Sequence, residues 1–102
     1  MVLVAIAGCG GLTALPPDKQ DYAGFWVGPT ISLTIGQDAE VEYARDSAGG
    51  STSISGQIER FDGDNFVVYA VMNFSFKVTA PPHVDARDGL THMSINGEDV
   101  NK

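Results

Sequence analysis

Apolar and polar residues alternate one by one in several short stretches of this chain. An alternation with period two places every second side chain on the same face, which is typical of a half-buried β-strand. The clearest case is residues 30–35, where three apolar side chains alternate with serine and threonine. The other predicted strands cover residues 40–43, 54–61, 66–69, 74–79, 90–95 and, as a short closing strand, 98–102.

Residues with turn-forming side chains separate the predicted strands. Tight turns are expected at residues 36–38, 62–65 and 96–97, and the last of these, Asn96-Gly97, is the strongest hairpin signal in the chain.

Three further segments are expected to lie outside the strands. Residues 46–53 are rich in glycine and serine, which predicts a flexible loop. Pro81 and Pro82 are expected to end the strand before them, because proline has no N–H for a sheet ladder. Residues 83–90 are then expected to form a polar connection.

The pattern predicts an all-β fold. No window of twelve residues shows the 3.6-residue apolar period of an amphipathic helix. We expect six to seven short antiparallel strands in meander order, folded into a small barrel or sandwich. The pattern leaves these two architectures open. With 102 residues, the chain has room for one small domain.

Composition and charge exclude some partners. Thirteen acidic residues against six basic ones give a net charge of −7. Nucleic-acid binding is not expected, because phosphate neutralisation needs clustered Lys and Arg. Cys9 is the single cysteine, so an intrachain disulfide is impossible and a cysteine-based zinc site is not expected.

The first residues resemble an export signal. Residues 2–8 are apolar or small, and they are too few to span a bilayer. The stretch Ile6-Ala7-Gly8-Cys9 resembles the lipobox of bacterial lipoproteins. This resemblance implies that Cys9 carries lipid and that residues 1–8 are a signal peptide, cut off before it. No basic residue precedes the apolar run, so a truncated signal or an upstream start is expected. The alternative is a buried N-terminal strand with Cys9 in the core.

The segment after the cysteine is expected to be a tether. Residues 9–21 contain glycines, a Pro-Pro pair and a polar end, without periodicity. The β domain is then expected over residues 22–102. Gly10 and Gly11 stand where an aspartate would resemble a retention signal for the inner membrane. The expected location is therefore the periplasmic face of the bacterial outer membrane.

Two further resemblances concern the predicted domain. Gly24-Phe25-Trp26 resembles the Gly-x-Trp opening of lipocalin-like barrels, in which the indole plugs the closed end; alternatively, Trp26 is simply the largest core residue. The wider pattern, residues 24–100, is similar to a group of small bacterial lipoproteins, and the shared segments begin at residues 24, 58 and 76 and end with the Asn-Gly hairpin. This likeness implies no activity.

Candidate chemistry is sparse. His83, His92, Asp85 and Asp88 are residue types that bind divalent metals, but their spacing matches no ligand template, and a solvated loop is the favoured interpretation. Residues 62–65 superficially resemble a calcium loop but lack the later acidic ligand, so a plain turn is favoured. No catalytic motif is present in the sequence, so neither enzymatic activity nor a cofactor is expected.

The function predicted from the sequence is binding. Apolar residues are dense over residues 66–76, and Val67, Tyr69 and Val71 form a candidate surface for an envelope protein or a small apolar ligand. Alternatively, this strand is central and covered on both faces. The leading hypothesis is a membrane-tethered, non-catalytic binding module of the cell envelope. The alternative is an acidic inhibitor of a basic toxin or cell-wall hydrolase, in which residues 38–42 supply negative charge.

Overall fold

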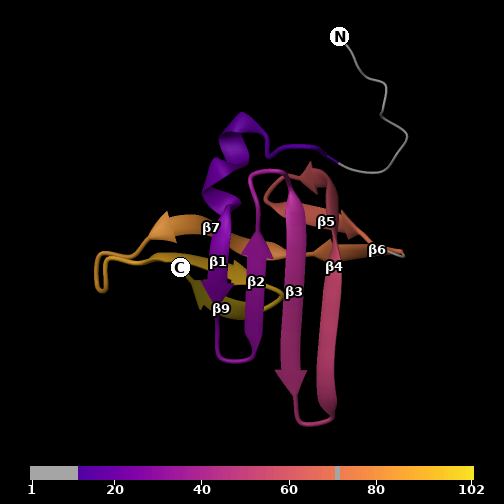
Figure 1. Cartoon of the computed structure of the whole chain (residues 1–102). Coiled ribbons are helices and arrows are strands. Elements are labelled where there is room, and N and C mark those ends of the chain that lie inside the picture. The colour runs from indigo at the N-terminus through magenta and orange to yellow at the C-terminus, as the bar shows by residue number, and fades with distance from the viewer. Residues whose placement is uncertain (1–11, 71) are drawn as a thin grey trace.

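The protein is an all-β domain. A computed structural model describes residues 12–70 and 72–102 (Figure 1). The described chain forms one antiparallel sheet with nine strands. The strands are β1 (Gly24–Val27), β2 (Ile31–Ile35), β3 (Glu40–Ser47), β4 (Gly50–Asp62), β5 (Asn65–Tyr69), β6 (Asn73–Phe76), β7 (Val78–Val84), β8 (Thr91–Ile95) and β9 (Glu98–Asn101).

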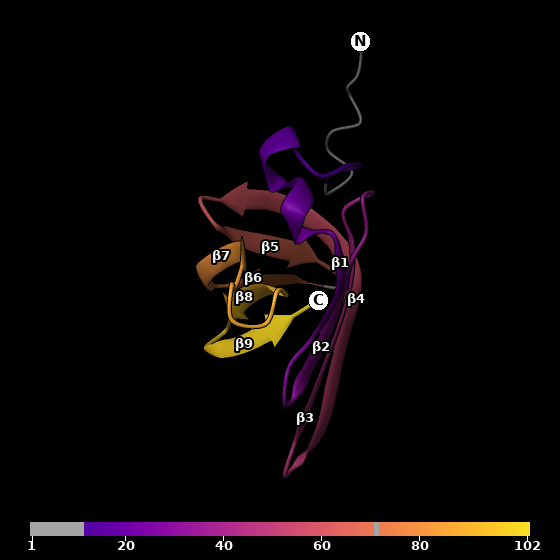
Figure 2. The same ribbon diagram turned by 90° about the vertical axis from the view of Figure 1, so that its left-hand side faces the viewer.

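The sheet follows a meander with one closing contact. Its order is β6-β5-β4-β3-β2-β1-β9-β8-β7, so every neighbouring pair except β1 and β9 is consecutive in the chain. Val27 and Asn101 form the pair that joins β1 to β9. The sheet curls into a half-barrel (Figure 2). The predicted antiparallel meander is confirmed, but the predicted number of six to seven strands is too low.

The prediction of a flexible loop over residues 46–53 is wrong. This segment is the end of a long hairpin, in which Ser47 pairs with Gly50 and β4 continues to Asp62. Residues 44–53 are exposed, because the hairpin extends beyond the core (Figure 2). A strand that is exposed to solvent on both faces has no need for alternating apolar and polar residues, so its composition resembles that of a loop.

The two prolines do not end a strand. Pro81 and Pro82 lie inside β7, which extends to Val84 and takes two residues of the predicted polar connection. A strand tolerates proline at the edge of a sheet, where no neighbour needs its N–H, and β7 is an edge strand. Register shifts between Val78 and His83 accompany the prolines.

The core lies between the two halves of the curled sheet (Figure 2). Strands β1 to β4 form one wall, and β5 to β9 fold back against it. Trp26 is fully buried and donates its indole N–H to the Tyr22 carbonyl at 2.9 Å. Stacked Phe66 and Phe76 rings, 5.1 Å apart, fill the space near β5 and β6. Other fully buried side chains include Leu33, Ile35, Ile58, Met93, Ile95 and Val100.

Residues 12–21 of the predicted tether lie against the sheet instead of extending away from it. The Leu12 N–H donates to the Ile58 carbonyl at 2.7 Å, and the Leu15 side chain is buried. A 3-10 helix follows over Pro17–Tyr22. These contacts make residues 12–21 part of the folded domain.

Tyr22 fastens the end of this helix. Its hydroxyl donates to the Asp64 carbonyl at 2.8 Å, and its ring meets Phe61 edge-on at 5.2 Å. Burial raises the pKa of Tyr22 to about 12, because the charged phenolate would lose its hydration. No helix in the described part of the chain is long and apolar enough to cross a membrane.

The predicted turns at residues 62–65 and 96–97 close two-residue hairpins. Asp62 pairs with Asn65, and Ile95 pairs with Glu98. Asn96 has φ of 50° and Gly97 has φ of 85°, the left-handed conformation that favours an Asn-Gly pair.

Candidate binding surface on the outer face of the sheet

The face of β1 to β4 that points away from the core presents ordered rows of side chains, and we call it the outer face. One row runs across four strands through Phe25, Thr34, Glu42 and Ser55. The next row contains Val27, Ser32, Ala44 and Ser53. Most of these side chains are short, so the face offers backbone and hydroxyl groups on β2 to β4, beside two exposed apolar residues on β1.

Phe25 and Val27 are the apolar residues of this face. Phe25 is 59% exposed and Val27 is 45% exposed, although Trp26 between them is fully buried. The sequence analysis did not place them on a surface. The available signal was the period-two alternation around Trp26, which sends both neighbours outward if Trp26 faces the core.

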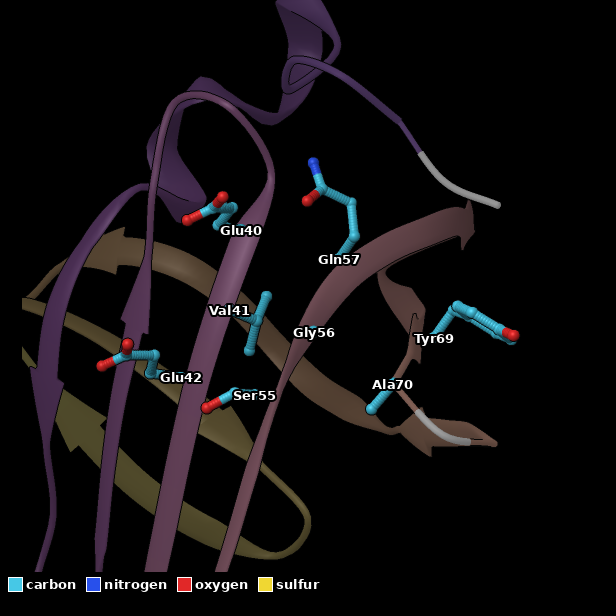
Figure 3. A pocket seen from close by; sticks show the side chains of 8 residues that line it. All are labelled: Glu40, Val41, Glu42, Ser55, Gly56, Gln57, Tyr69 and Ala70. Atoms are coloured by element: carbon cyan, nitrogen blue, oxygen red, sulfur yellow. The ribbon is translucent and has the colours of Figure 1, made fainter. Parts of the chain in front are cut away.

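Two hollows lie side by side on the outer face. The larger, about 450 Å³, lies where β3, β4 and the end of β5 meet (Figure 3). Val41 and Gly56 lie at the base of this hollow, and the Tyr69 ring points away from them (Figure 3). The smaller, about 210 Å³, extends toward Phe25 and shares Glu42 and Ser55 with the first. The two hollows are therefore direct neighbours on this face.

The larger hollow is acidic. Glu40 and Glu42 line it, and neither carboxylate forms a salt bridge with a described residue. Gln57 closes one end, because its side-chain amide donates to the carbonyls of Asp38 and Leu12, both at 2.6 Å. The rim therefore carries negative charge that no Lys or Arg within residues 12–70 and 72–102 pairs with.

The predicted apolar surface is only partly accessible. Val67 is 7% exposed, although it lies on the outer side of β5, opposite Arg60 and Ser75. Tyr69 is 44% exposed and borders the larger hollow. Val71 lies outside the described residues. Of the predicted surface, Tyr69 is thus the described member that a partner can reach, and it adjoins the acidic hollow.

A second polar cluster lies at the other end of the sheet, around His92 on β8. Its Nε2 lies 2.7 Å from an Asp88 carboxylate oxygen, and its Nδ1 lies 3.0 Å from an Asp99 carboxylate oxygen. Ionised carboxylates only accept hydrogen bonds, so both ring nitrogens donate when the imidazole is protonated. These two bonds raise the pKa of His92 and favour the imidazolium.

The metal-binding residue types noted in the sequence, for which a solvated loop is favoured, lie around the same histidine. Asp85, Asp88 and His92 offer ligand atoms that lie within 4.8 Å of one another. His83 pairs with His92 across β7 and β8, but its Nδ1 lies 2.9 Å from the Pro81 carbonyl. The acidic groups already have internal partners.

Arg87 holds Asp85 in particular. Its guanidinium donates to both carboxylate oxygens, at 2.8 and 3.1 Å, and lowers the pKa of Asp85 well below its usual range. A metal ion would have to displace these bonds as well as the bond from His92 to Asp88. The cluster as folded is a set of ion pairs that ties the loop before β8 to β9.

The remaining predicted site lies at Cys9, outside the described residues. Within the described chain, the outer face of β1 to β4 with the end of β5 is the surface that combines exposed apolar side chains, hollows and unneutralised charge. Comparisons with protein-family models, with curated proteins and with solved structures find no match for this chain.

Proposed function

We propose that this protein is a non-catalytic binding module of the bacterial cell envelope. Lipid attached to Cys9 holds it at the periplasmic face of the outer membrane, and the outer face of β1 to β4 binds a partner protein. The anchor rests on the sequence Ile6-Ala7-Gly8-Cys9, which resembles a lipobox.

The observation that carries this proposal is the exposure of Phe25 and Val27 on the face that also holds the two hollows, the smaller of which Phe25 lines. Burial of apolar area against a partner releases roughly 25 cal/mol per Å². Grouped apolar side chains on a sheet face are a common feature of docking surfaces. The short side chains beside them on β2 to β4 would let a partner approach these strands closely.

A protein partner fits this surface better than a small apolar ligand does. The interior of the half-barrel is filled by Trp26, Leu33, Met93 and the other buried side chains. The hollows lie outside the barrel, on a surface that extends across four strands. Such a surface matches an extended contact area rather than an enclosed ligand cavity.

Inhibition of a basic toxin or hydrolase is the alternative function. The unneutralised carboxylates of Glu40 and Glu42 favour it, because they would attract a basic partner and make its association sensitive to salt. The two functions differ in which side chains are required and in how salt acts on binding.

A pull-down from envelope extract distinguishes them. The full-length lipidated protein is compared with Phe25→Ser/Val27→Ser and with Glu40→Lys/Glu42→Lys, at low and high salt. Leu90→Ser is the control, because Leu90 is an exposed apolar residue at the other end of the sheet. Loss of a specific partner with the Phe25/Val27 variant alone supports the docking module. Loss with the charge variant and at high salt supports the inhibitor.

Two results would overturn the proposal. One is the absence of a saturable partner at either salt concentration. The other is turnover of an envelope substrate by the purified protein. The anchor is tested separately by Cys9→Ser, which should move the protein from the membrane fraction to the soluble fraction and remove the mass of the acyl chains. Membrane association that survives Cys9→Ser would contradict lipidation at this residue.

A further inference from the structure

Strand β4 is much longer than the strand that covers its side. β4 runs from Gly50 to Asp62 and pairs with β3 from its first residue. Its pairing with β5 begins only at Gln57. In Figure 1 the lower half of β4 has β3 on one side and no strand on the other. Within the described residues, the stretch 50–56 therefore has a sheet edge without a ladder partner.

The register shows which backbone groups face this edge. The hairpin has a two-residue turn, so Ser47 and Gly50 bond to each other, and Thr52 and Ile54 also direct their N–H and C=O groups toward β3. The bond from the Asp46 N–H to the Thr30 carbonyl agrees, because Asp46 faces β2. By alternation, Ser51 and Ser53 direct their N–H and C=O groups to the open side.

Gly56 permits the β5 backbone to approach β4 closely at the point where their pairing begins. A Cβ atom on Gly56 would lie 2.4 Å from the Tyr69 carbonyl oxygen, so the β5 backbone passes directly over this residue. The chain then turns, with the Ala70 N–H donating to the Met72 carbonyl at 3.0 Å. The larger hollow lies at this junction, lined by Ser55 and Gly56 of β4 and by Tyr69 of β5.

The uncovered edge lacks the usual protection against strand pairing. Natural edges are blocked by lysine, proline or inward-pointing charges. The edge strand β7 contains Pro81 and Pro82, and Lys77 directly follows the edge strand β6. Residues 50–56, in contrast, contain no proline and no charged residue. Their composition is compatible with pairing to another strand.

We propose that this edge binds an extended segment of a partner protein as an additional strand, and that the segment carries basic side chains. The proposal deepens the proposed function and rests on it, because it assigns the mode of contact and the charge of the partner. The basic character follows from Glu42 and Asp46, which lie on β3 directly opposite Ser55 and Ser51 on the outer face.

The geometry permits these charges to meet. An added strand would lie about 9–10 Å from β3, which is two strand spacings. The intervening side chains on the outer face are the short Ser51, Ser53 and Ser55, so a long lysine or arginine can reach across them toward Glu42 and Asp46. A second copy of this chain is disfavoured as the occupant, because each copy has a net charge of −7.

Amide hydrogen exchange on the full chain tests the edge itself. In the free protein, the amides of Ser51 and Ser53 should exchange faster than those of Thr52 and Ile54, which bond to β3. Equal protection at all four amides would mean that the edge is already covered or that the hairpin is open, and either result would overturn the proposal.

A defined peptide tests the occupant. The probe is a seven-residue peptide of alternating lysine and valine, and it should slow exchange at Ser51 and Ser53 at least about tenfold. Two controls have the same length: one carries N-methyl groups on alternate residues, which remove the backbone donors, and the other has glutamate in place of lysine. The proposal would be overturned if both control peptides slowed exchange at Ser51 and Ser53. It would also be overturned if the probe peptide did not slow it.

Ser53→Pro tests the same edge in the protein. The substitution removes an N–H that points to the open side and leaves the ladder to β3 in place, and edge strands tolerate it. Ser53→Ala is the matched control, because it retains the N–H. We expect Ser53→Pro to weaken peptide binding at least about tenfold and Ser53→Ala to leave it unchanged. Equal binding by both variants, with the fold intact by circular dichroism, would refute the proposal.

The same variants separate this proposal from the proposed function. A partner from envelope extract that is lost with Phe25→Ser/Val27→Ser but retained with Ser53→Pro would leave the binding module standing and remove the added strand. Absence of a partner with the unaltered protein would remove the binding module. The peptide experiment would then decide separately whether the edge accepts a strand.

Discussion

Lys102, the last residue, lies over the indole ring of Trp26, with its ammonium nitrogen 4.8 Å from the ring centre. The same nitrogen donates to the backbone carbonyls of Asp21 at 2.9 Å and Ala23 at 2.5 Å. A cation over an aromatic face is attracted by the ring quadrupole, and here the contact also covers the buried tryptophan. Lys102 thus covers the core at the entrance to β1.

Lys102→Met should lower the free energy of unfolding by about 1–2 kcal/mol, since it removes the cation and two hydrogen-bond donors but keeps most of the apolar stem. Urea unfolding monitored by Trp26 fluorescence measures the change. Lys77→Met is the control, because Lys77 is exposed and its ammonium group forms no hydrogen bond or ion pair with another described residue. Equal unfolding midpoints for the two variants would contradict the assigned role of Lys102.

Glu98 should stabilise the turn between β1 and β2. One carboxylate oxygen accepts from the N–H groups of Thr30 and Ile31, at 2.8 and 3.1 Å, and the other accepts from the Thr30 hydroxyl. Glu98→Ala should lower the free energy of unfolding by only about 1 kcal/mol, because solvent around the exposed carboxylate weakens these hydrogen bonds. Glu98→Gln should cost less, because its carbonyl oxygen can still accept from both N–H groups.

The contribution of Glu98 should depend on pH. The hydrogen bonds from Thr30, first through its side chain, lower the pKa of Glu98 in the folded protein. The stabilisation is therefore present above the unfolded-state pKa and is lost as pH falls through the lower, folded-state pKa. The difference in unfolding free energy between wild type and Glu98→Ala should shrink from pH 7 to pH 3. A constant difference would contradict this assignment.

His92 should show the opposite pH dependence. Its pKa is raised above 6.5, first by the bond to Asp88 and then by the bond to Asp99. The stabilisation from the imidazolium is therefore complete below the unfolded-state pKa and is lost as pH rises through the folded-state pKa. A proton NMR titration of the His92 ring should give a higher pKa in wild type than in Asp99→Asn. Titration at or below 6.5 in the folded wild type would exclude the double ion pair.

Gly56→Ala should destabilise the sheet by about 1–3 kcal/mol, since the added methyl group would collide with the Tyr69 carbonyl and must push β5 away from β4. Gly49→Ala is the matched control, because a Cβ at Gly49 meets no atom within 4 Å. Thermal unfolding followed by circular dichroism compares them. Similar losses for both variants would mean that close approach of β5 is not the reason for glycine at position 56.

The sequence predicts the strands that have one wet and one dry face. Every second position of β2 enters the core, so apolar residues stand at Ile31, Leu33 and Ile35. The last hairpin is predictable for another reason, because Asn96 and Gly97 readily adopt the left-handed conformation that its turn requires. The first residues of β4, 50–53, are not predicted as a strand, because a strand that is exposed to solvent on both faces shows no alternation of apolar and polar residues. Pro81 and Pro82 were misinterpreted, since the sequence does not show which strand lies at an edge.

The candidate surface could be predicted less well than the fold. Val67 is apolar and faces outward, but the pattern cannot show that its neighbours on β4 and β6 cover it. Phe25 and Val27 were overlooked because the Gly-Phe-Trp-Val stretch is apolar on both faces of β1. The acidic hollow depends on β5 leaving β4 at Gly56, which is a property of the three-dimensional path of the chain.

The pairing of β1 with β9 also determines when the domain can finish folding. Val27 must meet Asn101, and Thr30 must meet Glu98, across nearly the whole length of the chain. Contacts of such sequence separation carry a large loop-closure entropy and form slowly. The meander from β1 to β6 can assemble from local hairpins, but Trp26 stays without its Lys102 cover until β9 has paired with β1. The last step of folding is therefore the one that shields the largest core side chain from water.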